Sequence, residues 1–235
     1  MKILILFNII TVLSFASTTN LSFIKSHELF KTKNVLFEST LNEQSLIYAT
    51  RTLQKEPKIV YSDKLIQDLK LQEIEKVLLF CHELGHFEAG APYKKRGRTI
   101  YNSWSSSEGQ ADFYSTLICI KKFNLSMLKA KPVSNQEIIK EIEDLCSNHL
   151  ENSCHEVLKG IYNLVKVYQS WTNESVKLSF FKTNLYPTYH TILGYPSNQC
   201  RLITLLNGYM CSEEDQVYSQ CLDGINRRPR CWFSE

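Results

Sequence analysis

The stretch from Phe80 to Pro92 reads FCHELGHFEAGAP and places two histidines four residues apart in an apolar surrounding. Residues at this spacing share one face of a helix, so His82 and His86 can bind one metal ion together. Glu83 then projects beside them. Two histidines do not complete a metal site, so the meaning of the stretch depends on what the rest of the chain supplies.

The residues on either side of this stretch predict where its helix begins and ends. Apolar residues recur at helical spacing from Leu71 to Ala89, which is typical of a helix with a buried side. Gly90 and Pro92 then end it, because glycine adopts the left-handed cap and proline cannot continue the hydrogen-bond ladder. Upstream, residues 57–62 (PKIVYS) are β-rich. We therefore expect a strand, a turn and then this helix.

A third metal ligand is expected from a separate element. Glu108 and Asp112, in the segment EGQAD, are four residues apart at the head of a helix that we predict from Glu108 to about Phe123. Glu108 can bind the metal, while Asp112 can accept a hydrogen bond from the far ring nitrogen of His82. Taken alone, the same two residues are also typical of an acidic helix start that favours the helix dipole. Together with His82 and His86 they predict a site for one zinc ion, Zn2+.

The pattern also predicts a chemistry. Zinc lowers the pKa of a bound water to about 7. A neighbouring carboxylate can then accept that water's proton as the water attacks a carbonyl carbon. We therefore assign Glu83 as the general base, since it lies beside both histidines in the sequence.

HELGH followed by EGQAD resembles the gluzincin metallopeptidases, in which a glutamate of ExxxD completes a helical HExxH site. The closer resemblance is to the family of HtpX, BepA and the CAAX prenyl endopeptidases, where a strand of type KIVV, a turn and a short helix lead into HELGH. It covers residues 55–120, and 190–206 more weakly. It implies an α+β, mainly helical, zincin-like metallopeptidase domain with a small β-sheet beside the HExxH helix. The membrane helices of HtpX and of the prenyl endopeptidases have no counterpart here.

That family also carries HPxxxxRI, where this chain has Tyr195, Pro196, four residues later Arg201, and Leu202. Tyrosine thus stands where the family has histidine. A tyrosine hydroxyl can also donate to an oxyanion, so Tyr195 is the predicted donor and His190 is the alternative. Arg201 is expected to brace the zinc ligands or to bind substrate. An ordinary loop tyrosine, an exposed histidine and a solvated arginine are the alternative interpretations.

The resemblance implies a mode of substrate binding as well. In gluzincins the sheet edge next to the active-site helix holds an extended peptide by strand addition. The β-rich residues 57–62 are expected to do this here.

The N-terminus and the cysteines indicate export. Lys2, an apolar run to about Phe15 and small residues at the −3 and −1 positions of a cleavage site are typical of a signal peptide over residues 1–16. An uncleaved membrane anchor is the competing interpretation. All eight cysteines follow this segment, no CxxC pair occurs, and four of them lie in the last 36 residues. Disulfides in an oxidising compartment are therefore predicted.

One disulfide pairing can be proposed from helix geometry. Cys81 adjoins His82 but lies about 100° around the helix from the metal face. Cys119 lies seven residues beyond Asp112, near the face turned toward the zinc helix. We therefore predict a bridge from Cys81 to Cys119.

The rest of the chain predicts further helices and connections. Residues 93–107 are polar and predict a loop, residues 172–198 predict an extended connection, and residues 20–50 show no clear period. Further helices are expected near residues 135–150, 153–170 and 200–208. The predicted organisation is a signal peptide (1–16), a zincin-like metallopeptidase domain (17–210) and a Cys-rich C-terminal segment (211–235).

The expected function is an exported zinc-dependent endopeptidase, secreted or periplasmic, that hydrolyses protein or peptide substrates. Its mature chain is expected to have no stable membrane span, since no second apolar run reaches spanning length. A net charge of +3 with scattered Lys and Arg argues against a nucleic-acid partner. The alternative is a non-catalytic secreted module that binds zinc or is stabilised by disulfides.

Overall fold

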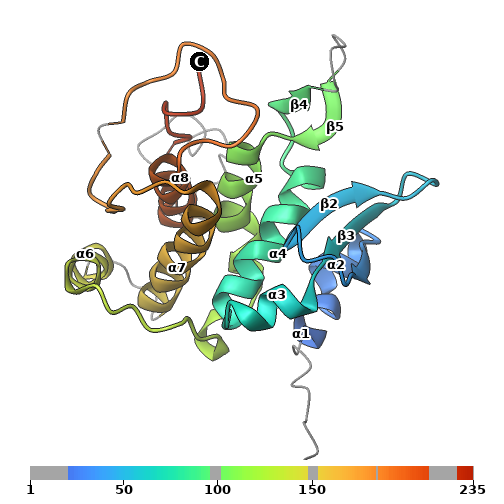
Figure 1. Cartoon of the computed structure of the whole chain (residues 1–235), viewed down its shortest axis with the longest axis horizontal. Coiled ribbons are helices and arrows are strands. Elements are labelled where there is room, and N and C mark those ends of the chain that lie inside the picture. The colour runs from blue at the N-terminus through green and yellow to red at the C-terminus, as the bar shows by residue number, and fades with distance from the viewer. Residues whose placement is uncertain (1–20, 96–101, 148–152, 184, 212–226, 235) are drawn as a thin grey trace, which may run out of the picture.

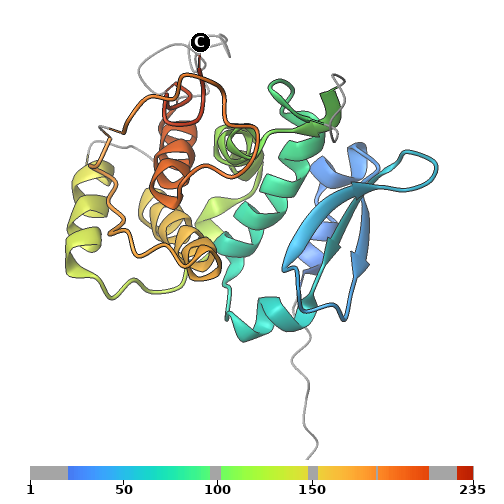
Figure 2. The ribbon, with the colours of Figure 1, turned by 45° about the horizontal axis from the view of Figure 1, so that its top comes forward.

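Helix α4 (Glu73–Glu88) lies between a three-stranded sheet on one side and a group of helices on the other (Figures 1 and 2). The computed structural model describes residues 21–95, 102–147, 153–183, 185–211 and 227–234. The chain is thus α+β and mainly helical, as predicted. The other helices are α1 (Ser22–Lys25), α2 (Glu28–Thr32), α3 (Asp63–Asp68), α5 (Glu108–Tyr114), α6 (Gln136–Cys146), α7 (Cys154–Thr172) and α8 (Asn198–Met210).

The sheet beside α4 has the strand order β1-β3-β2. Its strands are β1 (Leu36–Ser39), β2 (Ile47–Arg51) and β3 (Pro57–Tyr61), with β1 parallel and β2 antiparallel to β3. The expectation that residues 57–62 form the substrate-binding edge is wrong, because both sides of β3 are already paired. The two edge strands are β1 and β2, and β2 is the edge strand that packs against α4. Sequence patterning missed β1 and β2 because both strands are largely exposed or half-buried and lack a clean alternation.

A second sheet replaces a predicted loop. Strands β4 (Tyr93–Lys95) and β5 (Asn102–Ser106) pair antiparallel beyond the C-terminal end of α4 (Figure 1). The polar composition of residues 93–107 concealed this hairpin. Its base is fixed by the Ser107 N–H, which donates to the Pro92 carbonyl at 2.7 Å, and by the Ser106 hydroxyl, which donates to the Gly90 carbonyl at 2.7 Å.

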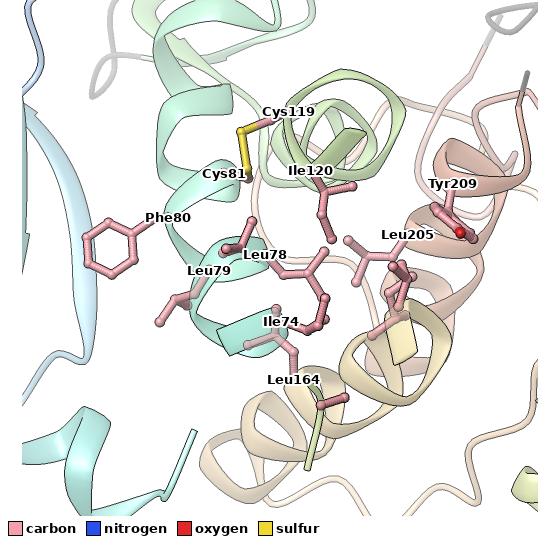
Figure 3. Packing of buried hydrophobic residues seen from close by; sticks show 14 of the residues in the cluster. Ile74, Leu78, Leu79, Phe80, Cys81, Cys119, Ile120, Leu164, Leu205 and Tyr209 are labelled. Carbon is pink, nitrogen blue, oxygen red and sulfur yellow. A yellow bond between two sulfur atoms is a disulfide. The ribbon is translucent and has the colours of Figure 1, made fainter. Parts of the chain in front are cut away.

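The core surrounds α4 on two sides, as expected for a central helix. Figure 3 shows Ile74 and Leu78 packed between α4, α7 and α8, while Phe80 points the other way. The Phe80 ring meets the Tyr61 ring of β3 with centroids 5.5 Å apart. Every residue from Ile74 to His86 except Lys76 is buried. Burial on both sides keeps the His82 and His86 backbone in one place.

The predicted helix from residue 108 to about 123 is continuous but changes its winding. Helix α5 passes into a π-helical turn (Ser115–Cys119) and then a 3-10 turn (Ile120–Lys122). A further 3-10 turn follows at Leu125–Met127. The Ser107 hydroxyl caps α5 by accepting from the Gln110 N–H. This cap fixes the helix start, and with it Glu108, which is the first residue of α5.

Three disulfides tie the helices together. Cys81 and Cys119 are bonded, as predicted, and join α4 to the turn that continues α5 (Figure 3). Cys146–Cys154 joins α6 to α7, and Cys200–Cys231 joins α8 to the C-terminal residues. Cys211 is also disulfide-bonded.

Two glycines permit unusually close contacts near the predicted site. A Cβ on Gly85 would lie 2.9 Å from the backbone of Ala111, so α4 and α5 touch where a side chain has no room. A Cβ on Gly109 would lie 2.3 Å from the ring of Trp232, which is fully buried. The C-terminal residues therefore pack directly on the start of α5.

Among the described residues, no helix is both long and apolar enough to cross a membrane. The predicted signal peptide, residues 1–16, lies outside them, as does most of the predicted Cys-rich segment, 211–235.

Candidate metal centre

His82, His86 and Glu108 converge on one point between α4 and α5. His82 Nε2 lies 3.1 Å from Glu108 Oε2, and His86 Nε2 lies 3.7 Å from Glu108 Oε1. One donor atom from each residue lies within 4.8 Å of the others, and all three side chains are buried. Three buried donors this close form a group that could hold a metal ion.

The far ring nitrogens of both histidines are engaged, which tests whether the residues fit a metal. His86 Nδ1 donates to the Ser106 carbonyl at 2.9 Å. His82 Nδ1 lies 2.7 Å from Asp112 Oδ1, off the axis of a regular hydrogen bond. Both Nε2 atoms therefore face Glu108, as metal-binding histidines require. The set of two histidines and one carboxylate suits a catalytic zinc with one open position.

Arg201 holds the carboxylate that faces His82. Its Nε and Nη2 donate to Asp112 at 2.7 and 2.8 Å, and both side chains are buried. The two-pronged contact fixes the carboxylate plane. The structure thus places the predicted Asp112 behind His82 and the predicted Arg201 behind Asp112, on α8.

The charges of the site act strongly on its histidines. Burial opposes a charge on His82, but Asp112 and Glu108 outweigh it and raise its pKa to about 9. Burial, together with the charge of His82, lowers the pKa of His86 to about 3. Burial also opposes a charge on Glu108, yet His82, His86 and Lys94 hold the pKa of its carboxyl well below the usual range. The pocket is thus built around a carboxylate that attracts positive charge.

Glu83 lies beside this group and is buried. Burial raises the pKa of its carboxyl to about 7, while the nearby His82 and the Ala49 backbone N–H act in the opposite direction. A carboxyl with a pKa near neutrality can both accept and return a proton at physiological pH.

The four residues line one side of a cleft of about 500 Å3. Edge strand β2 also lines the cleft, with Ile47, Tyr48 and Ala49. Further lining residues come from the segment before β2 and from α3, β4, β5, α7 and the segment before α8. The cleft is therefore bounded by the metal group and by a strand whose outer edge is unpaired within the described residues.

The two predicted oxyanion donors lie in different places. Tyr195 lines the cleft, is 72% exposed, and has its ring 5.7 Å from the Arg201 guanidinium. The charge of Glu108, together with partial burial, raises the Tyr195 pKa to about 12, so the hydroxyl keeps its proton. His190 is exposed and lies outside the cleft lining. The geometry therefore brings Tyr195, and not His190, toward the metal group.

Sequence reasoning missed two cleft residues. Lys94 of β4 pairs through its ammonium with Glu108. The Arg201 guanidinium lies over the ring of Tyr168 on α7, with its central carbon 3.8 Å from the ring centroid. The Tyr168 hydroxyl is buried without a hydrogen-bond partner among the described residues, and burial raises its pKa. Tyr168 fits the apolar spacing of its helix and Lys94 belongs to no motif, so neither gave a signal.

Comparison with known proteins finds no matching protein-family model, curated protein or solved structure. What the fold and site define is a class of centre: a buried group of two histidines and a glutamate that could bind a metal ion, with a further carboxylate beside it in an open cleft.

Proposed function

We propose that this chain is a zinc-dependent endopeptidase that hydrolyses peptide bonds in protein or peptide substrates. The observation that carries the proposal is the convergence of His82, His86 and Glu108 on a cleft that the Glu83 carboxyl also lines. A purely structural metal site needs four protein ligands and no base. Here three donors and a fourth, proton-accepting group share an open space, which favours hydrolysis.

The residues take distinct roles in this reaction. His82, His86 and Glu108 hold the metal, which when bound supplies a Lewis acid that activates water and polarises a carbonyl. Glu83 accepts the proton of the attacking water and then returns it to the leaving amine. Tyr195 donates a hydrogen bond to the carbonyl oxygen as negative charge develops on it. Asp112 and Arg201 keep His82 oriented.

The substrate is expected to lie along β2. An extended peptide can add to an unpaired sheet edge through main-chain hydrogen bonds. Ile47, Tyr48 and Ala49 line the cleft beside the metal group, and the Ala49 N–H donates to the Glu83 carboxylate. A peptide on β2 would therefore pass between the edge strand and the metal.

Two observations support an exported protein. The structure contains three disulfides among the described residues, which persist in oxidising compartments. The sequence of residues 1–16 is typical of a signal peptide. We therefore place the enzyme in the periplasm or outside the cell. The alternative, a non-catalytic zinc-binding or disulfide-stabilised module, leaves Glu83 without a role.

The decisive experiment substitutes the proposed base. Glu83→Gln keeps the shape of the side chain but cannot accept a proton, so we expect zinc content to remain near one ion per chain and peptide cleavage to fall by about 10²- to 10⁴-fold. Glu88→Gln is the matched control, because Glu88 lies on the same helix and pairs with Lys33 instead of lining the cleft. Undiminished cleavage by Glu83→Gln would refute the mechanism. A zinc-loaded wild type that cleaves nothing would favour the binding module.

A further inference from the structure

The cleft has two unlike parts, and Lys94 lies in one of them. Lys94 belongs to β4, whose hairpin is anchored beside His86, since the Ser106 carbonyl accepts from the His86 ring. The Lys94 ammonium reaches Glu108 Oε1. One third of the Lys94 side chain remains exposed (33%), so it also faces the space above the metal group.

The cleft also has an apolar part, lined by Leu46, Leu65, Leu79 and Trp171. The polar Gln44, Ser45 and Thr172, next to two of them in the chain, line the cleft as well. Leu79 precedes Glu83 by one helical turn, whereas Lys94 lies beyond His86, so Leu79 and Lys94 are on opposite sides of the metal group along α4. The helix rises about 10 Å from Leu79 to His86. About three residues of extended peptide span that distance.

The charges of the cleft leave Lys94 without full compensation once a metal binds. Arg201 is neutralised by Asp112, and Glu43 pairs with Lys64 at 2.6 Å. The remaining lining charges are Glu83, Glu108 and Lys94, because histidines that bind a metal are neutral. A divalent ion then balances the two carboxylates, and the lysine charge stays in excess.

The geometry also requires the metal and the ammonium to share one carboxylate. Glu108 Oε2 faces His82, and Oε1 faces both His86 and Lys94. The Lys94 ammonium has three N–H donors. Among the described residues, its ion-pair partner is the Glu108 carboxylate. At least one donor is therefore available to an anion that enters the cleft.

We propose that Lys94 binds a carboxylate of the substrate, and that the cleft selects peptides with an apolar side chain on one side of the cleaved bond and a carboxylate on the other. This inference rests on the proposed peptidase function. The carboxylate can be the side chain of Asp or Glu or the free C-terminus, since both present the same two oxygens to an ammonium. The apolar side chain would sit among Leu46, Leu65, Leu79 and Trp171.

The test begins with zinc-loaded wild type and a peptide library, to map a cleaved sequence by mass spectrometry. Matched peptides then carry Glu or Gln at the position nearest Lys94, each with a free or an amidated C-terminus. We expect wild type to show a kcat/KM about tenfold higher for the carboxylate peptide than for its neutral partner. The pair that shows the ratio identifies the source of the carboxylate.

Variants of Lys94 connect this ratio to the lysine. Lys94→Met should bring the ratio close to one, whereas Lys94→Arg should keep it. Lys95→Met is the matched control, because Lys95 is the exposed neighbour on β4 and does not line the cleft, so the wild-type ratio should persist. Zinc content is measured for each variant, because Lys94 touches a proposed metal ligand.

The outcomes separate this inference from the proposed function. If wild type cleaves both peptides equally, or if Lys94→Met keeps the wild-type ratio, the inference is overturned and the peptidase stands. If Lys94→Met slows both peptides equally without changing the ratio, Lys94 only braces Glu108, which also overturns it. If no library peptide is cleaved by wild type, the proposed function itself fails and the inference with it.

Discussion

The two sides of the cleft are built in opposite ways. On the side of α4, α5 and α8, the metal group and its supports are buried and joined by a disulfide, a close helix contact and an ion pair. On the side of β2, β4 and the segment before α8, the lining residues are half-buried or exposed. Under the proposed function, the buried wall would supply the chemistry and the exposed wall would select the substrate.

The buried wall owes its precision to contacts that leave little freedom. The Cys81–Cys119 disulfide is formed by the residue next to His82. Gly85 lets α4 touch Ala111, which lies about one helical turn after Glu108. The exposed wall is less enclosed, since Tyr48 and Tyr195 are 43% and 72% exposed. Substitutions on the buried wall should therefore change zinc affinity and the free energy of unfolding. Substitutions on the exposed wall should change turnover.

The largest expected effect comes from removing the ligand that α5 supplies. Glu108→Ala leaves only two histidines, and we expect zinc affinity to fall by more than about 100-fold, beyond the loss typical of supporting residues. Competition with a chromophoric chelator measures it. Glu137→Ala is the control, since Glu137 also lies in the first turn of a helix but is exposed. Wild-type affinity in Glu108→Ala would exclude this residue as a ligand.

The exposed wall is tested by its tyrosine. Tyr195→Phe should lower kcat by about 100-fold with KM and zinc content unchanged, because it removes one donor to the developing oxyanion. Tyr189→Phe, in the same segment and 94% exposed, should behave as wild type. Tyr168→Phe completes the comparison, since the buried Tyr168 hydroxyl has no hydrogen-bond partner within the part of the chain that the structure describes. A loss of kcat in Tyr168→Phe alone would move the donor role to α7.

A smaller effect is expected from crowding the buried wall. Gly85→Ala would place a Cβ 2.9 Å from the Ala111 backbone, so α4 and α5 must separate at a cost of about 1–3 kcal/mol in the free energy of unfolding. Denaturant unfolding measures it. Gly194→Ala has open space around the new Cβ and should change stability little. An unchanged Gly85→Ala protein would show that the helix contact does not constrain the site.

The smallest expected effect is the release of a proton from His82 when zinc binds, which makes the zinc affinity depend on pH. Without metal, His82 has a pKa of about 9 and is charged at pH 7.5, yet it must be neutral to bind zinc. Apparent zinc affinity should therefore rise with pH up to about 9 and level off above it. Calorimetry in two buffers of different ionisation enthalpy should show release of about one proton per zinc from His82 at pH 7.5, in addition to the proton that the zinc-bound water releases. No release from His82 would contradict the raised pKa.

Local patterns anticipated the buried wall better than the exposed one. The α4 and α5 helices, the shared face of His82 and His86, and the Cys81–Cys119 bond follow from helix periodicity, because spacing along a helix fixes which face a residue occupies. The grouping of Glu108 with both histidines was expected from the pattern of HExxH followed by ExxxD. Arg201 contacts Asp112 from a helix far away in the sequence. That helix was predicted near residues 200–208 and spans Asn198–Met210 in the structure.

The exposed wall depended on tertiary context that one sequence does not display. Strand β2 is short and mostly half-buried, and the β4–β5 hairpin is short and mostly polar, so no clean alternation of apolar and polar residues marks them. The order β1-β3-β2, which makes β2 an edge strand and β3 the central one, depends on pairing between segments and not on any segment alone. A role for Lys94 could not be predicted from the sequence, because it depends on the β4–β5 hairpin, which places Lys94 beside Glu108.

The C-terminal residues bear on both walls at once. The Trp232 ring covers Gly109, next to Glu108, while the backbone carbonyls of Arg230 and Trp232 accept from the N–H groups of Thr188 and Ile192, shortly before Tyr195. The Cys200–Cys231 bond holds this segment to α8.

Zinc binding and formation of the Cys200–Cys231 disulfide are therefore expected to be thermodynamically coupled. If the bond between Cys200 and Cys231 favours the arrangement that binds zinc, then zinc must favour that bond by the same free energy, because linkage is reciprocal. A thiol reductant should weaken zinc binding, and bound zinc should shift the reduction potential of this disulfide to a more negative value.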